Sequence, residues 1–173
     1  NLKEVKRLNR ILSRKQQGSN NRDRAKRDLA RLYRRITNQR SAWQWKIARE
    51  LVERHAFIGL ETLNIKAMQR LWGRKIGDYG FSDFVSILQY AASKVGTQIV
   101  HVGKWYPSSQ LCSACGYRFN GTKDLSVRRW ICPHCGAEHN RDVNAACNIL
   151  TEALCIAGKQ QRAGRSSVKV SQC

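Results

Sequence analysis

The sequence predicts a mixed α/β fold that begins with a basic helical hairpin and carries an inserted metal-binding ribbon. Three observations lead to this prediction. Apolar residues recur with helical spacing after residue 20, a strand-helix-strand order follows, and two CxxC pairs lie beyond it. A strand, a helix and a second strand in that order are typical of a crossover unit in an α/β sheet.

The first 55 residues are predicted to form the helical hairpin. They contain 17 Lys or Arg against 5 Asp or Glu, and a polar break at residues 17–21 divides them into a short and a long segment. Trp43 and Trp45 lie two residues apart and cannot share a helix face, so we expect only one of them in the core. Apolar residues of the long segment recur at steps of three or four residues or their sums, which is typical of an amphipathic helix: Leu29, Leu32, Tyr33, Ile36, Trp43, Ile47 and Leu51.

The strand-helix-strand order is read from residues 57–102. The apolar run at 57–63 is interpreted as a strand that carries one carboxylate. Ser82 is suited to cap a helix that Gly96 closes, and residues 97–102 follow as a second strand.

The predicted sheet is small for an α/β protein. Residues 65–80 contain three glycines among cationic and aromatic residues, which suggests a loop or an irregular helix. Only two strands are recognised, whereas a twisted sheet normally needs several strands to bury both faces. We therefore expect part of the sheet to lie upstream, outside this chain.

Two identically spaced cysteine pairs predict a zinc ribbon. Each pair encloses two residues and is followed by a glycine, and this spacing fits the four-cysteine zinc template. Zinc with four thiolates has no open coordination position, so the site is expected to be structural. The alternative is two reducible disulfides. His134 and His139 are expected to be surface residues because four thiolates already fill the coordination sphere: Cys112, Cys115, Cys132 and Cys135.

A final helix is predicted to begin at Asp142 and to end near residue 154. Cys147 lies in its apolar run and is expected to be a small buried hydrophobe. The residues after it are rich in Gly, Ser, Gln, Lys and Arg, and we expect them to be disordered.

The charge of the chain points to nucleic acid as a partner. The 32 Lys and Arg against 12 Asp and Glu give a net charge of +20, which attracts polyanions. No apolar run approaches the roughly 20 residues that span a bilayer, so no membrane partner is expected. Cysteine pairs without a visible secretory signal favour a reducing cytoplasm.

Two carboxylates lie where a carboxylate is unusual. Glu61 occupies an apolar strand, where an ionised group is costly unless a partner or a metal compensates it. Asp142 lies at a helix start, where the simplest alternative is an N-cap. From the residues alone, a metal-ligand role and a structural role remain open for both.

The chain resembles the C-terminal half of TnpB proteins, which are transposon-encoded, RNA-guided nucleases related to compact CRISPR effectors. The resemblance extends from the basic helices to about residue 154. It is carried by both cysteine knuckles with their flanking aromatic residues and by two further motifs: Ile-Gly-Leu-Glu-Thr-Leu at 58–63, the knuckle segments 105–116 and 130–136, and Arg-Asp-Val-Asn-Ala-Ala-Cys-Asn-Ile-Leu at 141–150.

This resemblance implies a RuvC-like nuclease domain with an RNase H fold, which the zinc ribbon interrupts. In that family a carboxylate triad holds two Mg²⁺ ions. Glu61 matches the second acid and Asp142 matches the third, while the first acid has no match in this chain. The implied partners are a guide RNA, a target DNA and the missing N-terminal part of the same protein, in a prokaryotic, nucleoid-associated cytoplasmic setting.

Five segments are expected on this basis. They are a basic helical hairpin of the RuvC-like domain (1–55), a RuvC-like strand-helix-strand core (56–104), a zinc ribbon (105–140), a final RuvC-like helix (141–156) and a disordered basic tail (157–173).

We expect the chain to be the C-terminal fragment of an active enzyme that cuts DNA at sites chosen by its guide RNA. A nuclease-inactive, RNA-guided DNA binder or a plain zinc-ribbon DNA binder is the alternative, because two carboxylates alone would hold a metal pair poorly. A DDE-type transposase is disfavoured by the position of the ribbon.

Basic and aromatic residues are the candidates for nucleic-acid contact. Trp105, Tyr106 and Trp130 flank the knuckles and could stack on bases, but packing beneath the ribbon is the favoured interpretation. A solvated basic surface is the alternative for the cations. The candidate phosphate contacts are Arg24, Lys26, Arg27, Arg31, Arg34, Arg35, Arg118, Lys123, Arg128 and Arg129.

Overall fold

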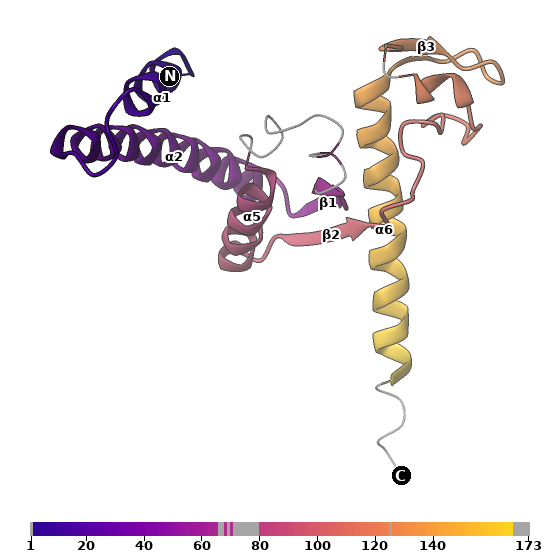
Figure 1. Ribbon diagram of the computed structural model, residues 1–173. Helices are drawn as coiled ribbons and strands as arrows, with labels where there is room; N and C mark the ends of the chain where they lie inside the picture. The colour runs from indigo at the N-terminus through magenta and orange to yellow at the C-terminus, as the bar shows by residue number, and fades with distance from the viewer. Residues whose placement is uncertain (1, 66–67, 69, 71–79, 125, 168–173) are drawn as a thin grey trace.

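The computed structural model describes residues 2–65, 68, 70, 80–124 and 126–167, and it has the predicted mixed α/β architecture (Figure 1). None of the helices in these ranges has both the length and the apolar character needed to cross a membrane. The elements, in chain order, are α1 (Leu2–Ser13), α2 (Asn20–Arg54), β1 (Phe57–Glu61), α5 (Phe81–Val95), β2 (Gln98–Val102), the 3₁₀ helix η1 (Asn120–Lys123), β3 (Arg129–Ile131), β4 (Glu138–Asn140) and α6 (Arg141–Ser167).

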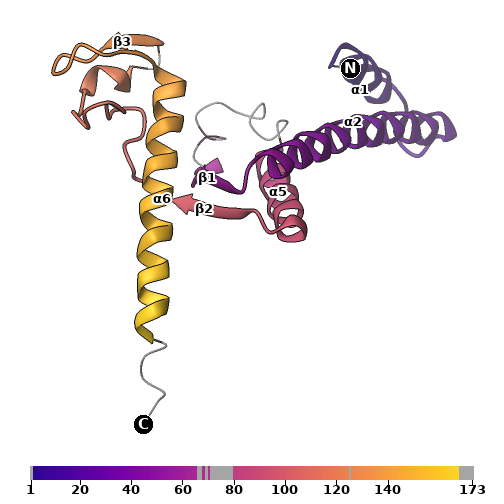
Figure 2. The ribbon, with the colours of Figure 1, turned by 180° about the vertical axis from the view of Figure 1, so that it is seen from behind.

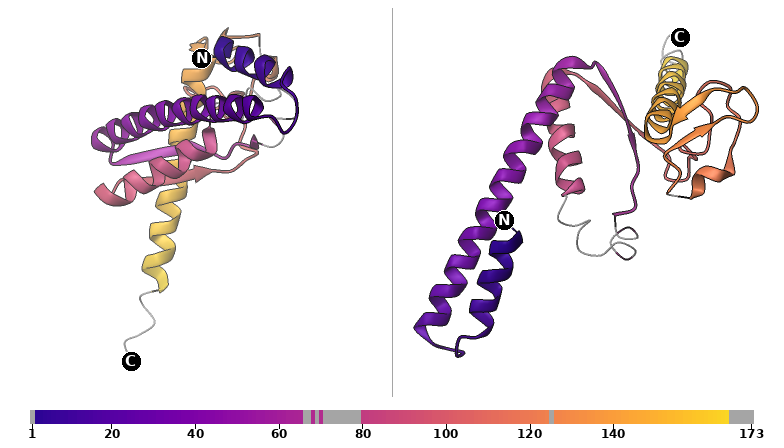
Figure 3. Two further views of the ribbon diagram at one scale, coloured as in Figure 1. Left: turned by 60° about the vertical axis from the view of Figure 1, so that its left-hand side comes forward. Right: turned by 90° about the horizontal axis from the view of Figure 1, so that it is seen from above.

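Helices α1 and α2 form the predicted hairpin, with α1 folded back along the first half of α2 (Figure 3). The Ser19 side chain caps α2 by accepting a hydrogen bond from the N–H of Arg22. The Arg22 guanidinium in turn donates to the carbonyls of Leu12 and Lys15, at 3.1 and 3.0 Å. One arginine therefore closes the turn that the polar break at 17–21 predicted.

The second half of α2 packs on α5 through a face one residue away from the predicted stripe. Gln44 and Ala48 are buried, and the Gln44 amide donates to the Gly80 carbonyl at 3.0 Å. Trp43, which we placed in the stripe, is 61% exposed, so that prediction is wrong. Trp45 is half-buried and meets Tyr90 edge to face, at 5.7 Å between ring centroids, so one tryptophan packs inward as expected.

Strands β1 and β2 form a parallel pair with α5 as the crossover, as predicted. The register places Glu61 opposite Val102. Helix α5 begins after Gly80, whose φ of 61° is left-handed, and the cap predicted at Ser82 is wrong. It ends at Gly96, with φ of 80°, as expected from the preference of this position for glycine.

The two faces of this sheet pack against different helices. Ile58, Leu60 and Ile99 face the core formed by α2 and α5, whereas Val100 and Val102 face α6. The carboxyl ends of both strands point toward α6, as the views from the front and from behind show (Figures 1 and 2).

Gly59 lies in close contact with α6. A Cβ atom at this residue would lie 2.9 Å from the Cβ of Ala153 and 3.3 Å from the Ile149 carbonyl oxygen. Ala153 is fully buried. Two small residues therefore let β1 lie directly on the helix.

Helix α6 is longer than predicted. It continues to Ser167, so the prediction of a disordered tail from residue 157 is wrong for residues 157–167, and residues 168–173 lie outside the described part. Ala157 is buried against the sheet, and the Lys, Gln and Arg that follow are strong helix formers. Cys147 is exposed rather than buried. Residues 71–79, which hold most of the predicted irregular loop, also lie outside the described residues.

Candidate metal centre and carboxylate site

The two cysteine knuckles have the same backbone conformation. In each knuckle the N–H of the trailing glycine donates to the carbonyl of the first cysteine, from Gly116 to Cys112 at 2.8 Å and from Gly136 to Cys132 at 2.9 Å. Both glycines have a left-handed φ, 75° and 73°, which L-residues with a side chain rarely adopt. Each turn therefore brings its two cysteine side chains toward a common point.

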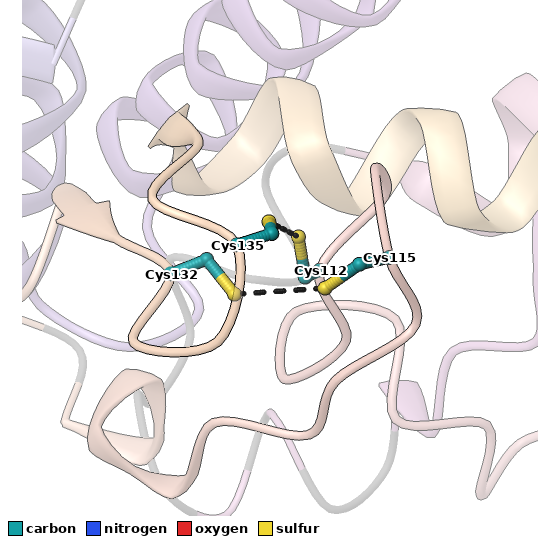
Figure 4. Close-up of side chains that lie close together, drawn as sticks. All are labelled: Cys112, Cys115, Cys132 and Cys135. Atoms are coloured by element: carbon teal, nitrogen blue, oxygen red, sulfur yellow. Dashed lines mark hydrogen bonds between the residues drawn. The ribbon is translucent and has the colours of Figure 1, made fainter.

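The four sulfur atoms form a compact cluster (Figure 4). All lie within 4.8 Å of one another, with 3.7 Å from Cys112 Sγ to Cys135 Sγ and 3.7 Å from Cys115 Sγ to Cys132 Sγ. A tetrahedron with zinc–sulfur bonds of about 2.3 Å has edges of about 3.8 Å. A disulfide requires about 2.05 Å. The cluster can therefore bind one metal ion such as zinc, and its geometry does not fit disulfides.

The pKa values of the cysteine thiols reflect how close together the four sulfur atoms lie. Burial of the Cys132 thiol opposes its ionisation, but N–H groups of Cys135 and His134 lower its pKa to about 7. The N–H of Tyr117 favours ionisation of Cys115, whereas burial and the neighbouring sulfurs together raise its pKa to about 12. Four thiolates this close repel one another unless a positive ion lies between them.

Aromatic rings pack beneath the ribbon. Trp130 is 6% exposed, stacks on Phe119 at 5.1 Å between ring centroids, and contacts the ring of His139 at 4.7 Å. The packing interpretation is thus confirmed for Trp130 and wrong for Trp105, which is 86% exposed. His134 is exposed as expected.

His139 was expected on the surface, and this is wrong. It is half-buried, and its Nε2 lies 3.0 Å from the Sγ of Cys112. Its ring also contacts Trp130, and it is a neighbour of the cluster rather than a member of the four-cysteine group.

Two buried asparagines join the ribbon to α6, and their role was not predicted from the sequence. Asn144 Oδ1 accepts from the N–H of Ser113 at 2.9 Å, and its Nδ2 donates to the Leu111 carbonyl at 2.6 Å. Asn148 donates to the same Leu111 carbonyl and to that of Ser108, both at 2.8 Å. The sequence feature that could have indicated this role is the four-residue spacing of the two asparagines, which places them on one face of the helix.

Glu61 and Asp142 lie on the two elements that meet at the β1–α6 contact. Glu61 alternates with Gly59 along β1, so it shares the strand face that lies on α6. Asp142 precedes Ile149 and Ala153 by 7 and 11 residues, close to two and three helical turns, so it shares the helix face that lies on β1.

The two carboxylates are exposed, and Asp142 lies about 10 Å along the axis of α6 from Ile149. Asn140 caps α6 by accepting from the N–H groups of Asp142 and Val143, so Asp142 itself is not the cap. Its Oδ2 lies 3.5 Å from Nη1 of Arg128. Within the described ranges, no third His, Cys, Asp or Glu forms a metal-binding group with these two acids. A metal-ligand role for these two carboxylates therefore stays a prediction.

Glu61 also lines a cavity of about 290 Å³ at the end of the sheet. The other walls are mostly apolar and come from the segment after β1, from the start of α5 and from β2: Thr62, Leu63, Ile65, Phe81, Ser82, Val85 and His101.

The predicted phosphate contacts are all exposed, and they fall into two groups at opposite ends of the molecule, on α2 and on the ribbon (Figures 1 and 3). Several already have partners. Lys26 and Arg31 pair with acids three residues earlier on α2, at 3.6 and 3.4 Å, and Arg118 donates to the Gln110 side chain. The structure does not bring the two groups together.

Sequence comparisons match most of the chain to known families. Residues 1–71 match a family described as "Probable transposase", and residues 81–149 match the Cas12f1-like TNB domain. A Streptomyces pristinaespiralis protein named "Putative RNA-guided DNA endonuclease" is 37% identical over 171 residues. A TnpB-like protein of Acanthamoeba polyphaga mimivirus is 30% identical over 162 residues.

The chain spans less than half the length of these relatives. The two alignments cover 92% and 88% of the chain, but only 42% of the first relative and 30% of the second. Two solved structures share the fold at 20% identity over 86% of the chain. One is a Cas12f1–sgRNA–target DNA complex, with TM-score 0.58 over 40% of that chain, and the other a CRISPR–Cas12f ternary complex, with TM-score 0.61 over 31%.

Proposed function

The chain belongs to the TnpB family, and from this premise we propose that it is the C-terminal, RuvC-like and zinc-ribbon part of an RNA-guided, magnesium-dependent DNA endonuclease associated with transposons. The observation that supports the proposal most is the contact of β1 with α6, the two elements that carry Glu61 and Asp142, in a chain that also holds a four-cysteine cluster. The relatives' names and the folds of the Cas12f complexes support it.

In this proposal Glu61 and Asp142 are catalytic carboxylates that ligate Mg²⁺. A pair of divalent ions activates the attacking water and stabilises the leaving oxygen in such enzymes. The four cysteines hold Zn²⁺ in a structural role, because four thiolates leave no coordination position open.

The third carboxylate would come from the rest of the protein. β1 pairs only with β2 among the described strands, so its other edge is open for a further strand. One exposed stripe along α6 is uncharged and mostly apolar. Its residues recur at the three- and four-residue steps of a helix face that packs against another element: Val143, Cys147, Leu150 and Leu154. We assign residues 1–55, 56–104 and 141–156 to the RuvC-like domain and residues 105–140 to the ribbon.

A guide RNA and a target DNA are the proposed partners, in a cytoplasmic, nucleoid-associated setting. Base pairing with the guide would choose the sequence, and the protein would contact phosphates. The net charge of +20 and the exposed basic residues of α2 and the ribbon, from Arg24 to Arg35 and from Arg118 to Arg129, support this role.

The test is cleavage by the complete protein with its guide. Glu61→Gln and Asp142→Asn keep the size of each side chain but remove its charge, so each should abolish Mg²⁺-dependent cleavage while binding of guide RNA is kept. Asp83→Asn, in an exposed carboxylate on α5, is the matched control. Full cleavage by either variant would reject the site assignment.

A nuclease-inactive, RNA-guided or zinc-ribbon DNA-binding protein is the second candidate. It is favoured by the finding that the described residues offer no third ligand beside Glu61 and Asp142. Guide-dependent DNA binding without any Mg²⁺-dependent cleavage by the complete wild-type protein would establish this alternative.

A further inference from the structure

We infer that Asn144 is a positioning residue that couples the metal-binding ribbon to Asp142, with Asn148 as its support. The inference rests on the proposed function for the role of Asp142. The coupling itself is a property of the described residues and is tested separately.

The first step is that the two asparagines hydrogen-bond to the backbone next to Cys112. Leu111 and Ser113 are the chain neighbours of this cysteine, and Asn144 bonds to both, through the Leu111 carbonyl and the Ser113 N–H. Asn148 bonds to the Leu111 carbonyl as well. The backbone on each side of one metal ligand is thus held by the first two turns of α6.

The second step is the isolation of this contact from water. Asn144 is 2% exposed, Asn148 is 6% exposed, and Cys112 is 1% exposed. Buried amides without partners are costly. The ribbon segment and the helix therefore stay together as long as the Cys112 knuckle keeps its shape.

The third step is the link to the carboxylate. Asp142 precedes Asn144 by two residues, in the turn that Asn140 caps from the end of β4. The N–H of Arg141 donates to the Arg128 carbonyl at 2.9 Å, so the start of α6 is also tied to the second half of the ribbon. Both halves of the four-cysteine cluster thus converge on the turn that carries Asp142.

The consequence is that loading of the cysteine cluster orders the first turns of α6. With a metal bound, the knuckle around Cys112 is rigid, and Asn144 transmits that rigidity to the helix. Without the metal or without the Asn144 amide, this part of α6 opens more often, while the part on the sheet, around Ala153, keeps its packing.

Hydrogen–deuterium exchange of the whole chain tests this coupling. Zinc removal by a chelator should speed exchange of the amides at 141–148 about tenfold, because local opening of these turns becomes more frequent. Amides at 153–157 should change little. Asn144→Ala in zinc-loaded protein should give the same local increase, and zinc removal from this variant should then add less than about twofold.

Thr151→Ala is the matched control, because the Thr151 side chain is exposed on α6 and its hydroxyl donates to the Cys147 carbonyl of the same helix. Equal exchange at 141–148 with and without zinc would overturn the coupling. So would an Asn144→Ala variant in which zinc removal has its full wild-type effect.

A cleavage readout separates positioning from a general loss of structure. In the complete enzyme, Asn144→Ala should raise the Mg²⁺ concentration for half-maximal cleavage about tenfold with unchanged zinc content and guide affinity. A lower maximal rate at unchanged Mg²⁺ dependence would reject the positioning role. If Asp142→Asn cleaves normally, the proposed function fails, while the exchange result still decides the coupling.

Discussion

Gly59→Ala should force β1 away from α6. The backbone of Gly59 does not need a positive φ, so the effect is steric alone. The new Cβ would lie 2.9 Å from the Cβ of Ala153, whereas carbon atoms in contact prefer about 3.5 to 4.0 Å. The strand or the helix must therefore move by roughly 0.6 to 1 Å.

Overpacking of this kind costs about 1 to 3 kcal/mol. For a chain of 173 residues, that corresponds to a fall in Tm of roughly 2 to 12 °C. The assay is thermal and urea unfolding of the zinc-loaded chain. Gly103→Ala is the control, because a Cβ at Gly103 meets nothing within 4 Å.

A compensating change sharpens the test. Ala153→Gly removes the atom that collides, at a cost of about 1 kcal/mol in helix propensity. The double variant should therefore be more stable than the sum of the two single changes predicts, by at least about 1 kcal/mol. Strict additivity, or a Gly59→Ala variant as stable as Gly103→Ala, would refute the close approach of β1 to α6.

Three further predictions concern the metal cluster and the basic surface. Cys112→Ser should reduce bound zinc from about one ion per chain to a small fraction, because the buried ligand at the ribbon–helix junction is lost. Elemental analysis measures the zinc content, and full retention of zinc would contradict the prediction. Zinc affinity should fall as the pH is lowered from 8 to 6, since protons compete for the thiolates and the pKa of Cys132 is about 7 in the metal-free cluster. Competition with a chelator measures this affinity, and a pH-independent value would be inconsistent with thiolate ligands. The double variant Arg34→Ala/Arg35→Ala should weaken nucleic-acid binding and lower the salt dependence of the affinity by about two phosphate contacts. Lys26→Ala is the comparison, because the charge of Lys26 is already paired with Asp23. Identical salt slopes for the double variant and for Lys26→Ala would exclude α2 as a phosphate-binding surface.

The sequence predicts best what short spacings determine. Two residues between cysteines and a glycine after them specify one turn, so the spacing alone is enough to place the four sulfurs around one point. The crossover from β1 through α5 to β2 was predicted from the order of strand, helix and strand along the chain.

Contacts between distant segments were not predictable in this way. The burial of Gln44 in place of Trp43 depends on the Gly80 carbonyl, 36 residues away. The role of Asn144 depends on docking to Leu111 and Ser113, more than 30 residues earlier. Extension of α6 through Ala157 depends on packing against the sheet, a contact with strands more than 50 residues earlier.

The most direct test is the structure of the complete protein with guide RNA, target DNA and a divalent ion that binds without permitting cleavage. Our account predicts that carboxylate oxygens of Glu61 and Asp142 ligate a shared pair of ions about 4 Å apart. Ions bound elsewhere, with these two side chains in contact only with solvent or protein, would contradict it.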